Sequence, residues 1–264
     1  MKEIIDQANI CLENRDDIPT APLWHMGKVA KFNSEDSFRL LQNTIDYLEC
    51  KARQNKDFTK EEKVFMKKIF ECFWWGGQYH GYKEAAKLAD HYVNGNGKKL
   101  KINEDVYRTS VIVNDTCSAI KNYLRARNEN NKFISTITTA NQDFINSKYA
   151  ALLKSGKRNV STQGYMLNNG CLLAEQNNQR LKNADNRFYL HASTIKAAGY
   201  FTTTWRVESI YDFEPFASNK DYVTHIPLSG SYTLKIPDGL SHYLTTINVA
   251  RNFDYYAEWT EKWK

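Results

Sequence analysis

The chain has 264 residues, 42% of them hydrophobic and 13% aromatic, which excludes a disordered polypeptide and allows one large domain or two small ones. Its formal charge of +6 comes from 36 basic and 30 acidic residues. Because these charges are spread along the sequence and not gathered into one tract, they argue against nucleic acid as a partner.

The N-terminal segment, MKEIIDQANICLENRDD, has acids and amides where a signal peptide needs an uninterrupted apolar run. No later stretch approaches the length of a membrane span. The five cysteines lie far apart without a CxxC pair, so neither a disulfide framework nor a zinc site is indicated. We therefore expect a protein made in the cytoplasm without a signal peptide. The first thirty residues, with Pro19, Pro22 and the cluster PLWHMG, predict an extended arm.

Helical periodicity dominates the first half of the chain. Apolar residues recur every three or four positions, and the first two helical segments begin with a hydroxyl residue followed by acids, as helix N-termini often do. The third helix is stopped by the NGNG sequence at 94–97, because asparagine and glycine readily accept left-handed backbone angles. The predicted helices cover residues 34–54, 59–75 with an end at Gly76-Gly77, 82–93 and 103–127.

After residue 128 the sequence turns polar, NENNKFISTITTANQD, which marks the best place for a boundary or a long connection. A further helix is expected over 141–153. The periodicity then changes to two, with the Thr, Tyr, Phe and Val content of strands. The predicted strands cover residues 159–167, 171–175, 187–197, 200–213, 222–228, 231–236 and 253–263. A short helix over 238–250, capped by Asp238, precedes the last strand.

The order of these elements predicts an α+β fold. A helical region, residues 1–128, is followed by a β-rich region, residues 129–264. The β-rich region is expected to form an antiparallel, aromatic-rich sheet with one short helix and to carry the activity.

One carboxylate-rich corner, at the end of the long strand predicted over 200–213, is the best candidate site. Asp212 and Glu214 are separated by one residue, so in a strand they lie on the same side and could share a metal or divide acid and base roles. Glu208 lies four residues earlier, on that side too. The alternative is a solvent-facing polar stripe opposite a buried face formed by Val207, Ser209, Tyr211 and Phe213.

Histidines could complete this site. His225 lies in the next predicted strand, and a hairpin between the two strands would bring it near Asp212 or Glu214 as a general base. The alternative for His225 is a surface or core histidine without a catalytic role. His242 lies on the exposed or ligand-facing side of the short helix; its adjacency to Ser241 means little, because helix neighbours point away from each other.

Several motif templates are absent. The chain has no GxGxxG before a helix, no GxxxxGK[ST], no GxSxG, no HExxH and no EF-hand loop. Dehydrogenases, nucleotide hydrolases, serine hydrolases of the elbow type and zinc peptidases are therefore not indicated.

The Tyr211-Asp212-Phe213 corner resembles toxin domains that bacteria deliver into competitors, including those of polymorphic and type VI secreted effectors, where a strand ending in Tyr-Asp-Phe follows a helical half. It is also distantly similar to the colicin M group, whose active site contains a Tyr-Asp pair with a nearby acid, histidine and arginine. Tyr211 and Asp212 match that pair. The acid expected two residues earlier is Ser209 here, and no His-Arg dipeptide follows.

The colicin M group cleaves the undecaprenyl-pyrophosphoryl link of the peptidoglycan precursor lipid II with a divalent cation. The resemblance implies an antibacterial effector hydrolase that is delivered into the periplasm of a target cell, with a lipid-linked or envelope substrate, a cognate immunity protein and a secretion-machine carrier as partners. Asp212 and Glu214 would hold Mg²⁺, Glu208 would support them, Tyr211 would position the substrate and His225 would be the base. The alternative is a non-catalytic binding or adaptor protein of a secretion or phage-related assembly.

Overall fold

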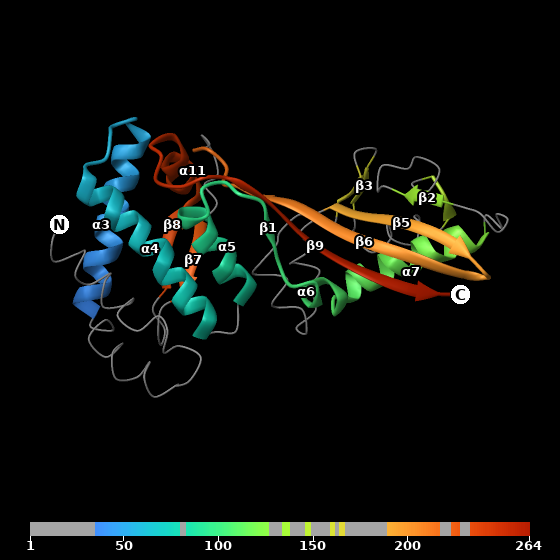
Figure 1. Ribbon diagram of the computed structural model, residues 1–264. Coiled ribbons are helices and arrows are strands. Elements are labelled where there is room, and N and C mark those ends of the chain that lie inside the picture. The colour runs from blue at the N-terminus through green and yellow to red at the C-terminus, as the bar shows by residue number, and fades with distance from the viewer. Residues whose placement is uncertain are drawn as a thin grey trace. The chain divides into compact units, whose positions relative to one another are not determined.

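The chain folds as two compact units in the computed structural model (Figure 1), which describes residues 35–79, 83–126, 134–137, 146–148, 159–161, 164–166, 189–216, 223–227 and 233–264. The first unit comprises Met1–Lys98 and Tyr211–Phe253, and the second comprises Lys99–Ile210 and Asp254–Lys264. Each unit therefore combines segments from both halves of the sequence. The predicted division between residues 128 and 129 lies outside the described residues.

The first unit contains helices and one two-stranded hairpin. Its described elements are α3 (Glu35–Arg53), α4 (Lys60–Tyr79), α5 (Lys83–Asn94), β7 (Val223–Pro227), β8 (Thr233–Pro237) and α11 (Asp238–Thr246). The first three predicted helices, over 34–54, 59–75 and 82–93, are confirmed. However, α4 does not end at Gly76-Gly77 but runs on to Tyr79, because glycine disfavours a helix by only about 1 kcal/mol per residue.

The ends of these helices follow the sequence signals. Before α4, the Thr59 N–H donates to Glu62 Oε2 at 2.7 Å and the Glu62 N–H donates to Thr59 Oγ1 at 3.3 Å, which forms a capping box. Lys51 Nζ donates to the same Glu62 oxygen at 2.6 Å, so this nearly buried carboxylate is paired. After α5, Asn96 and Gly97 have φ of 54° and 74°, as the NGNG sequence predicted.

Helix α11 begins differently from the prediction. The cap position is taken by Pro237, which makes no side-chain cap hydrogen bond, so the expected cap at Asp238 is wrong. Instead, Asp238 is the first residue of α11, and its Oδ1 accepts a hydrogen bond from Thr224 Oγ1 of β7 at 3.1 Å. The carboxylate thus links the hairpin to the start of the helix.

The second unit contains one long helix and a sheet. Its described elements are β1 (Leu100–Lys101), α6 (Asp105–Arg108), α7 (Val111–Ala126), β2 (Ile134–Ile137), β3 (Asn159–Ser161), β4 (Gly164–Met166), β5 (Tyr189–Ala197), β6 (Tyr200–Tyr211) and β9 (Phe253–Trp263). The helix predicted over 103–127 is broken into α6 and α7. The buried Ser110 lies at the break, where its Oγ accepts from the Val113 N–H at 3.5 Å.

The sheet has the strand order β1-β9-β6-β5-β4-β3, with β2 also paired to β5. The pairs β2/β5, β3/β4, β4/β5 and β5/β6 are antiparallel, whereas β1 and β9 are parallel. The strands β5 and β6 are joined by a tight turn at Ala198 and Gly199, where both φ values are positive, at 50° and 78°. Strand β2 lies in the polar stretch where we expected a boundary.

One face of this sheet forms the core of the second unit. Every second residue of β6 from Phe201 to Val207 is buried, and Trp205 is fully buried. Helix α7 lies against this face, since the Lys121 amine is 6.0 Å from the centre of the Trp205 ring. The fold is therefore α+β, as predicted, with helices mostly first and strands mostly second.

Some predicted segments lie outside the described residues. These are the extended arm over the first thirty residues, the strand over 171–175 and most of the helix over 141–153. Within the described residues, no helix combines the length and the apolar character that crossing a membrane requires.

Candidate functional site

The segment from Tyr211 to Phe216, named here the corner, leaves β6 within the first unit. Asp212 and Glu214 are exposed, whereas Tyr211 and Phe213 are half-buried. The two carboxylates therefore point to solvent while the aromatic rings turn into the unit.

The rings of the corner pack in an aromatic cluster. The centre of the Tyr92 ring of α5 lies 5.6 Å from that of Tyr211 and 5.0 Å from that of Phe213. Tyr211 also stacks on Phe253 at 5.3 Å, and Phe213 contacts Phe70 of α4 at 6.1 Å. Burial in this cluster raises the pKa of Tyr211, so its hydroxyl stays protonated at neutral pH.

Tyr92 lies at the centre of this cluster, and two carboxylates affect the pKa of its hydroxyl. Tyr92 is fully buried, and its hydroxyl donates to the Ser241 carbonyl at 2.8 Å. Burial raises the pKa of Tyr92, and the charges of Tyr211, Asp212 and Asp238 raise it further. Asp212 and Asp238 therefore both lie within electrostatic reach of one hydroxyl. The position of Asp238 is fixed by the hydrogen bond that its Oδ1 accepts from Thr224 Oγ1.

The histidine that joins the corner is His242. Its Nδ1 lies 2.8 Å from the Phe213 carbonyl oxygen. A carbonyl oxygen only accepts, so Nδ1 must carry the proton, and in the neutral ring Nε2 then keeps a lone pair. His242 follows Asp238 by four residues and hence lies on the same side of α11. This spacing of acid and histidine on one helix was the signal in the sequence that could have indicated His242.

His225 is placed differently from the prediction. Strand β7 pairs with β8, and His225 lies opposite Lys235 in that hairpin. Strand β6 has β5 and β9 as its neighbours. The expected hairpin between the long strand and the strand of His225 is therefore wrong. The position of the His225 side chain lies outside what the structure describes.

Glu208 belongs to an ion-pair cluster in the second unit. Its Oε1 accepts from Arg206 Nε at 2.7 Å and from Lys99 Nζ at 3.2 Å, and its Oε2 lies 3.6 Å from His191 Nε2. Burial alone would raise the pKa of Glu208, but the hydrogen bonds from Arg206 and Lys99 outweigh it and hold the pKa below its ordinary value. These contacts correspond to the polar stripe that was the alternative reading of the sequence.

This lowered pKa predicts a loss of stability in acid. The lowered pKa means that the folded state favours the ionised form of Glu208 more than the unfolded state does. The contribution of Glu208 to the free energy of unfolding is therefore complete above the ordinary pKa of 4.5, and it is lost as the pH falls through the lower pKa of the folded state. We expect the wild-type protein to lose up to about 1 kcal/mol more than Glu208→Gln between pH 5 and pH 3. Urea unfolding at each pH measures this difference, with Asp254→Asn as an exposed control; identical pH profiles for wild type and Glu208→Gln would contradict it.

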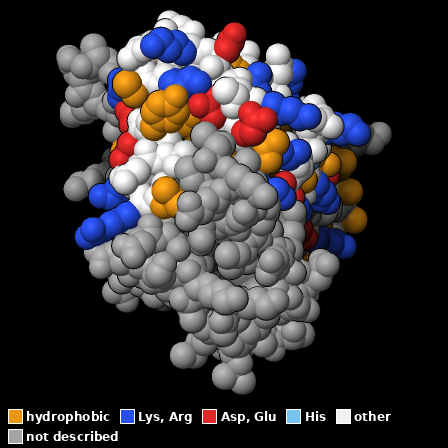
Figure 2. Space-filling model, turned by 90° about the vertical axis from the view of Figure 1, so that its left-hand side faces the viewer, with side chains coloured by type: hydrophobic (Ala, Val, Ile, Leu, Met, Phe, Trp, Pro, Cys, Tyr) orange, Lys and Arg blue, Asp and Glu red, His pale blue; other side chains and the backbone are white. Residues whose placement is uncertain are grey.

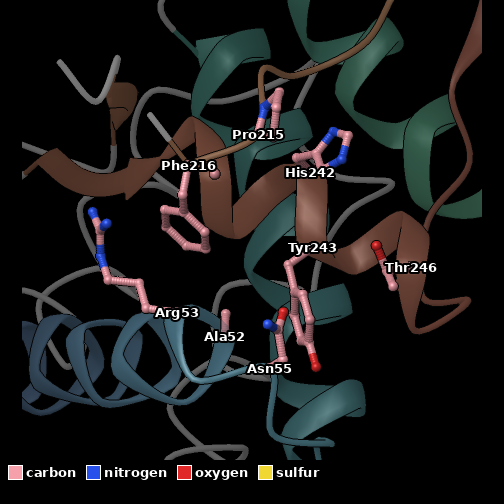
Figure 3. Close-up of a pocket in the computed structure, with 9 residues that line it drawn as sticks. Ala52, Arg53, Asn55, Pro215, Phe216, His242, Tyr243 and Thr246 are labelled. Carbon is pink, nitrogen blue, oxygen red and sulfur yellow. The ribbon is translucent and has the colours of Figure 1, made fainter. Parts of the chain in front are cut away.

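A pocket of about 380 Å³ lies beside the corner (Figure 3). It is lined by Ala52, Arg53, Asn55, Pro215, Phe216, Gly239, His242, Tyr243 and Thr246. Arg53 and Phe216 lie on one side of this hollow, and His242 and Thr246 lie on the other. The pocket thus joins the end of α3, the corner and α11, all within the first unit.

Two contacts shape one wall of the pocket. The Arg53 guanidinium lies 4.3 Å from the centre of the Phe216 ring and pairs with Glu49 at 2.8 Å. Gly239 allows Phe216 to lie against α11, because a Cβ at residue 239 would come within 2.1 Å of that ring. The described lining supplies hydrogen-bond donors and an arginine but no acid, and an anionic group would have to share or displace the pair of Arg53 with Glu49.

The described residues contain no group of three or more His, Cys, Asp or Glu side chains that could hold a metal ion by themselves. The expected ligands Asp212 and Glu214 are both exposed. Mg²⁺ is often held by only one or two carboxylates together with substrate phosphates. The corner therefore fits Mg²⁺ only if the substrate supplies further ligands.

Comparisons with models of protein families, with curated proteins and with solved structures found no match for this chain. On the face shown in Figure 2, lysine and arginine side chains are interspersed with aspartate and glutamate. Among the side chains described on this face, the mixture shows no patch of positive charge alone.

Proposed function

We propose that the protein is an antibacterial effector that hydrolyses a phosphoester or pyrophosphate link of a cell-envelope component, with lipid II as the preferred substrate. The observation that carries this proposal is the 2.8 Å contact between His242 Nδ1 and the Phe213 carbonyl. It supports an imidazole of defined tautomer at the Tyr211-Asp212-Phe213 corner, beside a pocket that contains an arginine. An acid, a histidine and an arginine near a Tyr-Asp pair are also what the resemblance implies.

In this proposal His242 replaces His225 as the general base. Its Nε2 accepts a proton from water, the water oxygen forms a bond to phosphorus, and the bond between phosphorus and the lipid oxygen breaks. The lipid leaves as its alcohol when the imidazolium returns the proton. Positioned proton transfer of this kind contributes about 10²–10⁴-fold to a rate.

The other residues have supporting roles. Arg53 binds the anionic group in the pocket, and Asp212 is the central acid, with Asp238 and Glu214 as further carboxylates. Bound Mg²⁺ would offset negative charge on the transferred phosphoryl group. Tyr211 positions the corner through its ring contacts. Glu208 has no catalytic role in this proposal, because Arg206 and Lys99 already bind its carboxylate in the second unit.

The proposal is tested with purified protein, lipid II and Mg²⁺. We expect release of the pyrophosphorylated disaccharide peptide, its loss on chelation with EDTA, and its loss in Asp212→Ala. The matched control is Asp254→Ala, which removes an exposed acid of the second unit. Product released by Asp212→Ala at the wild-type rate would reject the assignment.

A second candidate is a non-catalytic binding or adaptor protein of a secretion or phage-related assembly. The pocket favours it, since a 380 Å³ hollow lined by donors and aromatic rings suits an acidic side chain of a protein partner as well as a substrate. Expression in a bacterial host separates the candidates. Killing only when the protein is directed to the periplasm supports the envelope hydrolase, for which a cognate immunity protein and a secretion carrier are the proposed partners. Harmlessness in both compartments favours the adaptor.

A further inference from the structure

One end of the second unit gathers basic side chains around aromatic rings. This end, named here the basic tip, lies where the β5–β6 turn, the end of β9 and the C-terminal end of α7 meet (Figure 1). Its basic residues are Lys121, Arg125, Lys196, Lys262 and Lys264, and its aromatic residues are Tyr200, Phe201 and Trp263.

Two aromatic rings of the basic tip, those of Phe201 and Trp263, pack against each other. Phe201 and Trp263 stack with their ring centres 4.2 Å apart, and the Trp263 indole N–H donates to Thr203 Oγ1 at 2.9 Å. Both rings are nearly buried, at 7% and 8% exposed. The two rings therefore form a packed pair on the face of the sheet that Lys121 and Arg125 of α7 contact.

A lysine or arginine side chain lies over each of the rings of Tyr200, Phe201 and Trp263. The amines of Lys262 and Lys264 lie 4.5 Å and 4.8 Å from the centre of the Tyr200 ring. Arg125 lies 5.2 Å from the centre of the Trp263 ring, and Lys196 lies 5.1 Å from that of Phe201. Such contacts hold the positive charges together at one end of the unit in spite of their mutual repulsion.

The charge of the basic tip is only partly compensated. Glu261 accepts from Lys121 at 2.5 Å and from the Trp205 indole at 3.3 Å, so this acid is already engaged. Arg125, Lys262 and Lys264 are exposed. Beside them Tyr200 is 37% exposed and Ile195 is 51% exposed. The surface thus combines positive charge with apolar and amphipathic side chains.

We propose that the basic tip binds the surface of a bilayer that contains anionic phospholipids. Lysines whose amines lie over the ring of a partly exposed tyrosine suit the boundary between headgroups and acyl chains. Juxtaposed lysines and arginines are attracted by anionic headgroups. Single-stranded nucleic acid is less well matched, because it needs open ring faces for base stacking, whereas Phe201 and Trp263 stack on each other. This surface is separate from the corner and does not depend on hydrolysis.

Vesicle co-sedimentation of the full chain tests this proposal. We expect binding to vesicles of phosphatidylglycerol and phosphatidylcholine, little binding to pure phosphatidylcholine, and weakening as salt is raised. Each cation near such a surface contributes about fivefold to the affinity, so the double variant Lys262→Gln/Lys264→Gln should bind about 25-fold more weakly. The matched control neutralises two exposed lysines of the first unit, Lys60→Gln/Lys83→Gln, and should bind like wild type.

Three outcomes would overturn the proposal: no binding to anionic vesicles, equal weakening by the two double variants, or binding to a single-stranded oligonucleotide at concentrations where vesicles are not bound. A separate assay, hydrolysis of detergent-solubilised lipid II, distinguishes a failure of this proposal from a failure of the proposed function. Lys262→Gln/Lys264→Gln should retain that hydrolysis while losing vesicle binding. Vesicle binding without any hydrolysis would leave the basic tip supported and the hydrolase rejected.

Discussion

Replacing His242 by asparagine should lower the rate of lipid II hydrolysis by about 10²–10⁴-fold. The asparagine amide nitrogen is bonded to Cγ, as Nδ1 is in histidine, and can still donate to the Phe213 carbonyl, so the hydrogen bond between α11 and the corner is kept. What is lost is the lone pair on Nε2, which we propose as the acceptor of the water proton. Initial rates with saturating lipid II and Mg²⁺ measure the effect, and thermal unfolding verifies that the variant is folded.

Two other histidines are the controls for this variant. His225→Gln tests the base that the sequence suggested, and His191→Gln removes a histidine that contacts Glu208 in the second unit. We expect both to hydrolyse lipid II at nearly the wild-type rate. If His225→Gln loses activity and His242→Asn keeps it, the assignment of the base is wrong although hydrolysis itself stands.

Replacing Trp205 by alanine should lower the free energy of unfolding of the second unit by about 3–5 kcal/mol. Trp205 is fully buried, its ring centre lies 6.5 Å from that of Trp259, and its indole N–H donates to Glu261 at 3.3 Å. The alanine leaves a cavity between the sheet and α7, and it removes the indole from Glu261. Chemical denaturation followed by far-ultraviolet circular dichroism measures the loss.

The matched control is Thr202→Ala, on the exposed face of the same strand. We expect it to change the free energy of unfolding by less than about 0.5 kcal/mol, as surface substitutions usually do. A loss below about 1 kcal/mol for Trp205→Ala would contradict its place in the core.

The local signals of the sequence predicted most elements. Strand β9 (Phe253–Trp263) has the predicted bounds, and the capping box at Thr59 and Glu62 has the predicted hydrogen bonds. These features depend on side-chain periodicity and on contacts between residues three or four apart, which a sequence displays directly. Strand β2 was missed because four residues in a polar stretch become a strand only by pairing with β5.

The sequence pointed to the Tyr211-Asp212-Phe213 corner and placed Asp212 and Glu214 on one side of the chain, because alternation along one strand is local. Their exposure was the alternative to the site that we expected. The expected hairpin with the strand of His225 is wrong, since β7 pairs with β8, and the role of His225 stays a prediction. His242 reaches Phe213 across 29 residues, and no local pattern reports such a contact.

By itself, then, the sequence determined the α+β class, the positions of most helices and the faces of the strands, because backbone preference and hydrophobic period act between near neighbours. The tertiary structure alone decided which strands pair, that His242 contacts the Phe213 carbonyl, and that Glu208 is bound by Arg206 and Lys99. It also gathered Arg125, Lys196 and Lys262 from three elements into the basic tip, although the charges are spread along the chain. The physical reason is the same in each case: side chains distant in sequence meet only after the backbone hydrogen bonds and the buried rings have selected one register.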